Sequence, residues 1–499
     1  MTTYYVTTPI FYANDVPHIG HAYVTIAADA VARYHRQRGR DVFLLTGTDE
    51  HGINIERIAA ARGVPPQQHV DAIAGSFRDL WAQLDIGYDR FIRTSEPAHR
   101  RGALALWQRL QDSGDLYRGV YEGAYCARCE AYYQVDELVD GDCPVHKLPC
   151  ERVREENWFF RLTRYQDALE RLVRDSDFVQ PESRRKEVLG VLAQGLRDFS
   201  VSRRQVRWGI PVPGAPDEVL YVWVDALANY LTGVGFPDDL ATFERYWPAD
   251  VHIVGKEIIR FHCLYWPALL LSAGLALPRR VFAHGWLTKD GQKISKTTGN
   301  VIDPVALAHD SGSDAVRYFF LRAIPFGQDG DYQHAGFVAR YNADLANDFG
   351  NLVQRATRLA SRDRALAREN APLSQAEEDL RAHARVLADR VASAFEALAV
   401  HAAVAAIGDF VSEANRYLEI TAPWTLAKPG SSPRLELVLD HAVEAARLAA
   451  WYYAPIIPRA AAEAHQRLAG VPVEHGSGTF QPAPRGAVTF GPPLFPRRE

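Results

Sequence analysis

The pattern of apolar and polar positions near the N-terminus predicts a strand, a helix and a second strand. The stretch YYVTT, residues 4–8, is aromatic and β-branched as in a strand, and Pro9 is expected to end it. Apolar residues recur every four positions over 22–34, which predicts an amphipathic helix that stops near Gly39. The run DVFLLTG, residues 41–47, has the apolar character of a buried strand. This order predicts a βαβ unit with a parallel sheet.

The rest of the chain changes character several times. Helical periodicity continues to about Tyr117, and short mixed segments follow. Two strand-like stretches, EVLYVWVDALANYL and DVHIVGKEII, resume the α/β pattern, so we expect one α/β domain split by an insertion. Ala- and Leu-rich helical periodicity then predicts a helical bundle. The expected regions are a first α/β half (1–117), an insertion (118–218), a second α/β half (219–275), a connecting region (276–341), a helical domain (342–465) and a tail (466–499).

Composition narrows the function only a little. The chain has 499 residues and is 47% hydrophobic, enough for several buried cores. Its net charge of -5 does not indicate a nucleic-acid-binding surface, so such contacts depend on local basic patches. We expect no secretory leader, and we expect the most apolar stretch, CLYWPALLLSAGLALP, to be buried core because it is short and contains Pro267. The Gly- and Pro-rich tail is either a loose end or an extended strap.

The cysteines have the spacing of a zinc knuckle. Four of the five fall between Cys126 and Cys150, which favours a metal site over disulfides in a chain without a secretory leader. Cys126-x-x-Cys129 and Cys143-x-x-His146 supply four ligands for one tetrahedral Zn²⁺. Cys150 is an alternative fourth ligand; we favour His146 because its spacing forms the tight turn directly. Since protein ligands fill all four positions, the predicted zinc is structural.

Two histidines, His18 and His21, lie in the connection between the first predicted strand and the first predicted helix. Pro17 suits the first turn of that helix, and Gly20 lets a ligand approach the backbone. A helix N-terminus at the carboxyl end of a parallel strand favours phosphate. The alternative is a pair of partly exposed loop histidines, and the motif alone does not decide between the two.

A second motif, TKDGQKISKTTGN, places Lys293 and Lys296 on a loop bounded by Gly291 and Gly299. Two lysines on a glycine-bounded loop indicate a mobile cationic clamp, and the alternative is a solvated charged loop. In this order the two motifs resemble the paired signatures of class I aminoacyl-tRNA synthetases. The stretches TTPIFYAND, GTDEHG, YVWVDALANY and GKEIIRFHCLYWP extend the resemblance to the methionyl-tRNA synthetase family, in its bacterial form with a single zinc knuckle, over nearly the whole chain. Ile294 replaces a frequent Met of the family and keeps its apolar character.

The resemblance implies an α/β fold: a Rossmann-like parallel-sheet catalytic domain with a zinc-binding insertion, a stem-contact region with the lysine loop, and an all-α helical bundle that binds the anticodon. It implies methionine-tRNA ligase activity, in which L-methionine and ATP give methionyl-adenylate and the methionyl group passes to the 3′ end of tRNA(Met), including initiator tRNA, for translation. The implied cofactors are one structural Zn²⁺ and Mg²⁺ with ATP. We expect a cytoplasmic monomer without membrane contact.

The resemblance also assigns residues. The catalytic set is His18, His21, Lys293 and Lys296, and the ATP site adds Gly20, Glu257 and Ser295. The methionine pocket is expected to contain Pro9, Ile10, Tyr12, Asp49, Trp223, Ala226, Tyr230, Ile258, His262 and Trp266, with Asp49 pairing with the substrate ammonium. The anticodon set is Asn351, Arg355, Pro423 and Trp424. Without the resemblance, the alternatives are core packing for the aromatic residues and a turn or cap role for Asp49.

Two other functions are compatible with parts of the sequence. A small adenylyltransferase shares the His-x-Gly-His site, but it leaves the helical half of the chain unexplained. A catalytically inactive synthetase paralogue that only binds RNA is the alternative, and the intact set His18, His21, Asp49, Lys293 and Lys296 argues against it.

Overall fold

The computed structural model describes residues 2–126, 131–133, 138–144, 147–294, 300–361, 371–426, 433–482 and 488–498, with the backbone alone for 131–133 and Lys293. These residues form two compact units. The first comprises 1–28, 39–82 and 87–285, and the second comprises 29–38, 83–86 and 286–499.

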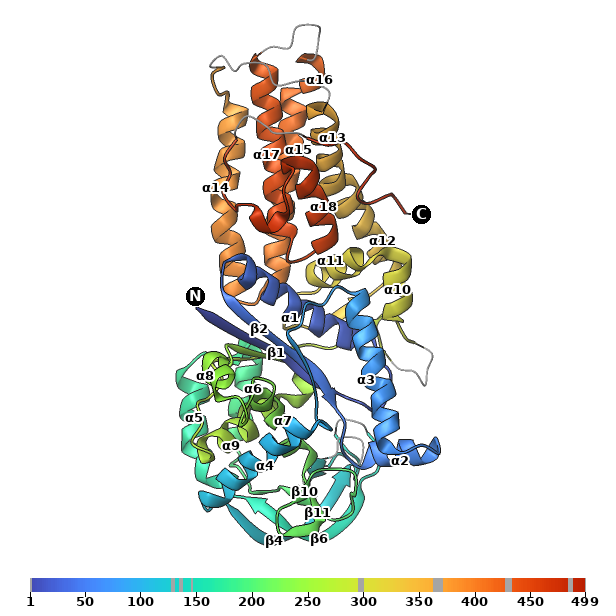
Figure 1. The fold of residues 1–499 in the computed structure, drawn as a ribbon, viewed down its shortest axis with the longest axis vertical. Coiled ribbons are helices and arrows are strands. Elements are labelled where there is room, and N and C mark those ends of the chain that lie inside the picture. The colour runs from blue at the N-terminus through green and yellow to red at the C-terminus, as the bar shows by residue number, and fades with distance from the viewer. Residues whose placement is uncertain are drawn as a thin grey trace. The chain divides into compact units, whose positions relative to one another are not determined.

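A six-stranded parallel sheet forms the centre of the first unit (Figure 1). The strands lie in the order β3-β2-β1-β12-β13-β7. Their bounds are β1 (Thr3–Tyr12), β2 (Asp41–Asp49), β3 (Arg90–Arg93), β7 (Val179–Gln180), β12 (Val251–Gly255) and β13 (Val281–His284). The strand order changes direction between β1 and β12, and the carboxyl ends of strands at such a point form a ligand-binding crevice in α/β proteins. The predicted parallel α/β sheet is confirmed.

Helices alternate with the strands of this sheet along the chain, and α4 to α9 share its apolar core. Their bounds are α1 (Ile19–Gln37), α2 (Ile53–Ala61), α3 (Pro66–Gln83), α4 (Pro97–Asp112), α5 (Gln166–Asp175), α6 (Glu182–Leu192), α7 (Val222–Thr232), α8 (Leu240–Tyr246) and α9 (Trp266–Ser272). The most apolar stretch of the sequence is core, as predicted: Cys263, Leu264 and Trp266 are almost fully buried. Across the described parts of the chain, no helix combines the length and apolar character needed to cross a membrane.

Two small antiparallel sheets are formed by the residues that lie between β3 and β12 in the sequence. The larger has the order β5-β4-β6-β8 and the smaller β10-β11-β9. Their bounds are β4 (Leu116–Cys126), β5 (Ala131–Tyr133), β6 (Glu151–Phe160), β8 (Phe199–Ser200), β9 (Ser202–Arg203), β10 (Pro211–Val212) and β11 (Ala215–Leu220). Between β6 and β8 the chain returns to the main sheet to add β7 at its edge.

The second unit is mainly helical, and α14, α15 and α17 run beside one another in it (Figure 1). Its helices are α10 (Pro304–Ser311), α11 (Ser313–Ala323), α12 (His334–Arg340), α13 (Asn351–Ala360), α14 (Gln375–Glu396), α15 (Val400–Thr421), α16 (Pro423–Leu426), α17 (Pro433–Tyr453) and α18 (Pro458–Ala469), with a π-helix over Tyr341–Gly350. Three short strands are β14 (Leu287–Lys289), β15 (Gln292–Lys293) and β16 (Gly330–Tyr332). The predicted helical bundle is confirmed.

The described part of the C-terminal tail lies along this unit as a strap. Arg467 donates to the carbonyl oxygen of Pro492 at 2.6 Å, and Thr489 donates to the carbonyl oxygen of Arg467 at 2.8 Å. The Tyr341 hydroxyl donates to the carbonyl oxygen of Pro496 at 2.9 Å. Of the two alternatives left by the sequence, these contacts select the strap.

Three predicted element boundaries were wrong. Pro9 does not end β1, because the missing N–H falls where pairing with β2 shifts register, between Thr7 and Ile10. Pro17 is outside the helix, since α1 begins at Ile19. The region up to Tyr117 is not wholly helical either, because β3 lies within it and β4 begins at Leu116.

The stretch EVLYVWVDALANYL was also assigned wrongly as strand-like throughout. Only its first part belongs to β11, and α7 begins at Val222. Nearly every residue of α7 is buried, so the helix lacks the polar face that would have revealed its period.

Candidate functional site

His18 and His21 pack against each other at the start of α1. Their ring centroids are 3.7 Å apart and nearly parallel. The backbone N–H groups of His21 and Ala22 both donate to the carbonyl oxygen of His18, so His18 is the residue that opens the helix. Phe11, at 4.8 Å between ring centroids, supports the inner face of His21. The structure therefore brings the two histidines together at a helix N-terminus.

Local hydrogen bonds define which nitrogen of each imidazole carries the proton. The His18 backbone N–H donates to Nδ1 of His21 at 3.2 Å, and the Gly20 backbone N–H donates to Nδ1 of His18 at 3.1 Å. Because Nδ1 accepts in both rings, each neutral imidazole carries its proton on Nε2. Both side chains are thus set to donate from Nε2, as an anionic phosphate requires.

Gly20 is needed for this arrangement. A Cβ at this position would lie 3.0 Å from Cε1 and 3.1 Å from Nδ1 of His18. A side chain here would push against the imidazole that accepts the hydrogen bond of Gly20, so glycine leaves room for the His18 ring; the predicted approach of a ligand to this backbone stays a prediction.

Tyr12 and Asp49 lie opposite each other at the carboxyl ends of β1 and β2. Their Cα atoms are paired in the sheet, and the Ala13 backbone N–H extends the pairing to the Asp49 carbonyl oxygen at 2.8 Å. Close approach of β3 is possible because Gly47 has no side chain; a Cβ there would lie 2.0 Å from the carbonyl oxygen of Ile92. Asp49 is the last residue of β2 and is half-buried at the carboxyl edge of the sheet.

A second group of predicted residues comes from α7 and the segment after β12. Trp223 stacks on Phe261 with ring centroids 3.7 Å apart. The Tyr230 hydroxyl lies 2.7 Å from Nε2 of His262, whose Nδ1 lies 3.0 Å from the carbonyl oxygen of Ile258. His262 therefore donates through Nδ1 to the carbonyl and accepts through Nε2 from the tyrosine.

Burial divides the predicted pocket into a wall and a floor. The half-buried members form the wall: Pro9, Ile10, Tyr12, Asp49, Trp223 and Ile258. The buried members form the floor: Ala226, Tyr230, His262 and Trp266. Burial lowers the pKa of His262 to about 4, so its imidazole is neutral near pH 7. The floor thus consists of aromatic and uncharged side chains.

Sequence reasoning missed residues behind this floor. The His252 ring stacks on Tyr230 at 4.1 Å, and Trp266 donates to its Nε2 at 3.3 Å. The Tyr5 hydroxyl donates to the Tyr230 carbonyl oxygen at 2.8 Å. Burial lowers the pKa of His252 well below its usual value, so this layer is neutral as well. Tyr5 is on β1 and His252 is on β12, the two neighbouring strands where the strand order changes direction, and this position could have revealed both residues.

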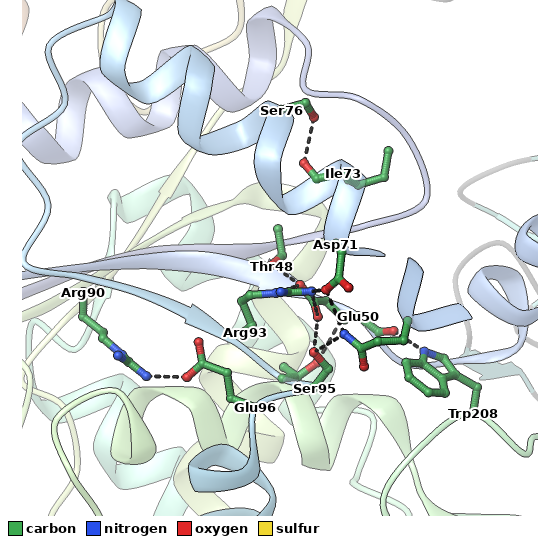
Figure 2. A network of polar contacts seen from close by, with 12 residues as sticks. Thr48, Glu50, Asp71, Ile73, Ser76, Arg90, Arg93, Ser95, Glu96 and Trp208 are labelled. Atoms are coloured by element: carbon green, nitrogen blue, oxygen red, sulfur yellow. Dashed lines mark hydrogen bonds and ion pairs between the residues drawn. The ribbon is translucent and has the colours of Figure 1, made fainter. Parts of the chain in front are cut away.

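A buried carboxylate, Glu50, holds the loop that follows β2 (Figure 2). Arg93 donates to it through Nε and Nη2 at 2.7 and 3.0 Å, and Thr48 donates at 2.6 Å. Ser95 also donates to Glu50, and Arg93 pairs with Asp71 at 2.6 Å. Sequence reasoning missed this network, which ties the residue after Asp49 to the end of β3.

The remaining ATP candidates are placed only in part. Glu257 is exposed after β12, and its carboxylate lies over Gly255, where a Cβ would meet Oε1 at 2.2 Å. Lys293 is in β15, and its side chain lies outside the described part. Ser295 and Lys296 also lie outside the described residues.

In the second unit, the structure brings Arg355 and Trp424 together. The Arg355 guanidinium lies 5.2 Å from the Trp424 ring centroid, and Trp424 is 49% exposed, so it is not a core residue. Ala422 adopts a left-handed φ of 41° that ends α15, and the buried Pro423 starts α16. Asn351 is half-buried at the start of α13, one turn before Arg355.

The predicted zinc ligands are described incompletely. Cys126 and Cys143 are buried in one small cluster with Cys150 packed against it. Burial and these two thiols raise the pKa of Cys150 to about 11. Cys129 and His146 lie outside the described residues. Within those that are described, no three His, Cys, Asp or Glu side chains form a metal site.

A histidine pair at a helix N-terminus, on a parallel sheet that is followed along the chain by a helical bundle, fits a class I aminoacyl-tRNA synthetase. The family model "tRNA synthetases class I (M)" matches residues 4–154 and 147–357, and that for the "Anticodon binding domain of methionyl tRNA ligase" matches 368–476. The chain belongs to the methionyl-tRNA synthetase family.

Similar proteins agree with this membership. A methionine--tRNA ligase of Nostoc sp. is 46% identical over 93% of this chain and 90% of its own length. One from Mycobacterium leprae is 43% identical over 100% and 95%. The structure of Mycobacterium tuberculosis methionyl-tRNA synthetase in complex with methionyl-adenylate has a TM-score of 0.95, 43% identity and complete coverage of both chains.

Proposed function

We propose that this chain is a methionine--tRNA ligase, which forms methionyl-adenylate from L-methionine and ATP and transfers the methionyl group to the 3′ end of tRNA(Met). The observation that carries the proposal is the arrangement of side chains at the carboxyl ends of β1 and β2. There Tyr12 and Asp49 are paired, and the histidine pair opens the helix that follows β1. Amino-acid-dependent ATP–pyrophosphate exchange, followed by charging of tRNA, tests the proposal.

The first step needs charge stabilisation rather than a base. The methionine carboxylate is already ionised near pH 7 and can attack the α-phosphorus directly. His18 and His21 donate from Nε2 to the phosphate oxygens, where negative charge increases. Lys293 and Lys296 are proposed to hold the leaving pyrophosphate, with Gly20, Glu257 and Ser295 completing the ATP site. Mg²⁺ supplies charge neutralisation on the phosphate oxygens when it accompanies ATP.

Methionine is proposed to bind between the wall and the floor of the pocket. Asp49 pairs with the substrate ammonium from the end of β2. The uncharged aromatic floor of Tyr230, His262 and Trp266 suits a polarizable thioether, and each sulfur–aromatic contact contributes only ~0.3–1.5 kcal/mol, so several are needed.

The helical domain is proposed to read the anticodon. Trp424 exposes an aromatic face on which a single-stranded base can stack, and Arg355 and Asn351 supply polar contacts. We also propose the division into catalytic halves 1–117 and 219–275, an insertion 118–218, a stem-contact region 276–341, a helical domain 342–465 and a tail 466–499. The proposed state is a cytoplasmic monomer.

One structural zinc is proposed for the insertion. Cys126 and Cys143 share a buried cluster, and soft thiolate ligands at this spacing fit Zn²⁺. Cys129 and His146 complete the proposed set. Zn²⁺ would supply a structural cross-link in the insertion and no direct chemistry.

We expect one zinc per chain, lost in Cys126→Ser and His146→Ala and kept in Cys150→Ser. Cys263→Ser is the matched control, because Cys263 is buried in the main core away from the cluster. Metal analysis with thermal unfolding measures this. If zinc is lost in Cys150→Ser but kept in His146→Ala, the fourth ligand is Cys150 and not His146. A folded wild-type chain that contains no zinc would contradict the proposal of a zinc site.

A further inference from the structure

The structure contains a buried histidine–aspartate–histidine cluster in the first unit that the reaction described above does not use. Asp225, on the first turn of α7, is 1% exposed. Its Oδ2 lies 2.6 Å from Nδ1 of His51, and its Oδ1 lies 2.8 Å from Nε2 of His99. His99 is fully buried, and its Nδ1 lies 2.8 Å from Thr232 Oγ1 at the other end of α7.

Asp225 is a carboxylate in this cluster. Burial on its own would raise the pKa of Asp225, but the charges and hydrogen bonds of His51 and His99 outweigh burial and lower it to about 2. A carboxylate only accepts, so His51 donates through Nδ1 and His99 through Nε2. The orientation of both imidazoles is thereby set from α7.

The cluster connects the two halves of the predicted methionine pocket. His51 is two residues after Asp49, the proposed partner of the substrate ammonium. Asp225 lies on α7 between Trp223 and Ala226, which are proposed to contact the methionine side chain. Hence the His51–Asp225 hydrogen bond joins the loop that binds one end of the substrate to the helix that binds the other.

Glu50, in the same loop between Asp49 and His51, is bound by residues of β2, β3 and the Trp208 segment rather than by α7. Glu50 is bound by Arg93 and Thr48 toward the end of β3 (Figure 2). The indole N–H of Trp208 donates to the Glu50 carbonyl oxygen at 2.6 Å, and the Gly52 backbone N–H donates to the Trp208 carbonyl oxygen at 3.1 Å. These bonds hold the loop to β3 and to the segment of Trp208, whereas the His51–Asp225 hydrogen bond holds it to α7.

We propose that Asp225 is a positioning residue for methionine: through His51 it holds Asp49 at the correct separation from Trp223 and Ala226 on α7. The inference rests on the proposed function of the pocket. Both ends of an amino acid must fit together, so a loop displaced from α7 weakens the charged hydrogen bond of Asp49 to the ammonium, a contact worth about 1.5–3 kcal/mol. Asp225 touches no substrate in this scheme and acts only by placing the loop.

Asp225→Asn is expected to raise the KM for methionine about tenfold or more, while kcat and the KM for ATP change by less than about threefold. His51→Gln should give the same pattern, because its amide can donate but does not reproduce the geometry of the ring. In the double variant the effects should not add, since both substitutions break one connection. ATP–pyrophosphate exchange at varied methionine and ATP measures all three variants.

Asp115→Asn is the matched control, because Asp115 is also buried in the first unit and accepts from Tyr165, Ser272 and Arg164. It should lower the melting temperature and leave the KM for methionine unchanged. Equal changes in both KM values in Asp225→Asn, or additive effects in the double variant, would overturn the proposal. If Asp225→Asn fails to fold, His51→Gln with an unchanged KM for methionine would overturn it. Wild-type protein without methionine-dependent exchange would instead refute the proposed function.

Discussion

His21→Asn is expected to lower kcat for methionyl-adenylate formation roughly 30- to 1,000-fold, with little change in the affinity for methionine. Nδ1 of His21 accepts from the His18 backbone N–H, so Nε2 is the donor toward the phosphate. Asparagine is shorter and its amide cannot keep both contacts. The loss corresponds to about 2–4 kcal/mol of transition-state stabilisation, the effect typical of removing one donor from a developing oxyanion.

Single-turnover adenylate formation and methionine titration measure the two quantities separately. His309→Asn is the control, since the His309 side chain is 86% exposed in the second unit and pairs with its neighbour Asp310. The control should behave like the wild type. If His21→Asn weakened methionine binding as much as it slowed the reaction, His21 would be part of the pocket structure rather than a phosphate donor.

Trp424→Ala is expected to raise the KM for tRNA roughly 5- to 150-fold and to leave ATP–pyrophosphate exchange unchanged. The Trp424 ring is 49% exposed and carries the Arg355 guanidinium on one face, which leaves it available for stacking. Base–aromatic stacking contributes about 1–3 kcal/mol per base by alanine substitution. Exchange needs no tRNA, so it reports whether the catalytic unit is intact.

Phe490→Ala provides a matched control for that substitution. Phe490 is 47% exposed and lies on the described tail of the same unit, outside the proposed anticodon set. Charging kinetics at varied tRNA should distinguish the two variants. A parallel fall of exchange and charging in Trp424→Ala would show a structural role for the tryptophan.

The sequence predicted features that depend on local spacing. The βαβ unit follows from runs such as YYVTT and DVFLLTG, and the histidine pair lies at the helix start because a strand–loop–helix order places it there. The resemblance to the family also located Tyr12 and Asp49, which the structure pairs across β1 and β2.

Features that depend on distant contacts could not be predicted. His51 meets Asp225 across 174 positions, and His99 meets the same carboxylate across 126. Nothing in the local pattern around Asp225 marks it, because an acidic residue in the first turn of a helix is common. The helix α7 itself was missed since burial on all sides removes its amphipathic period. Tertiary packing, not local propensity, determines these groups.

The central claim is that the crevice selects methionine and activates it with ATP. ATP–pyrophosphate exchange measured separately with each of the twenty amino acids tests it most directly. The account predicts strong exchange with methionine and only background with the other nineteen. Exchange driven best by another amino acid, or none with methionine by a folded chain, would contradict it.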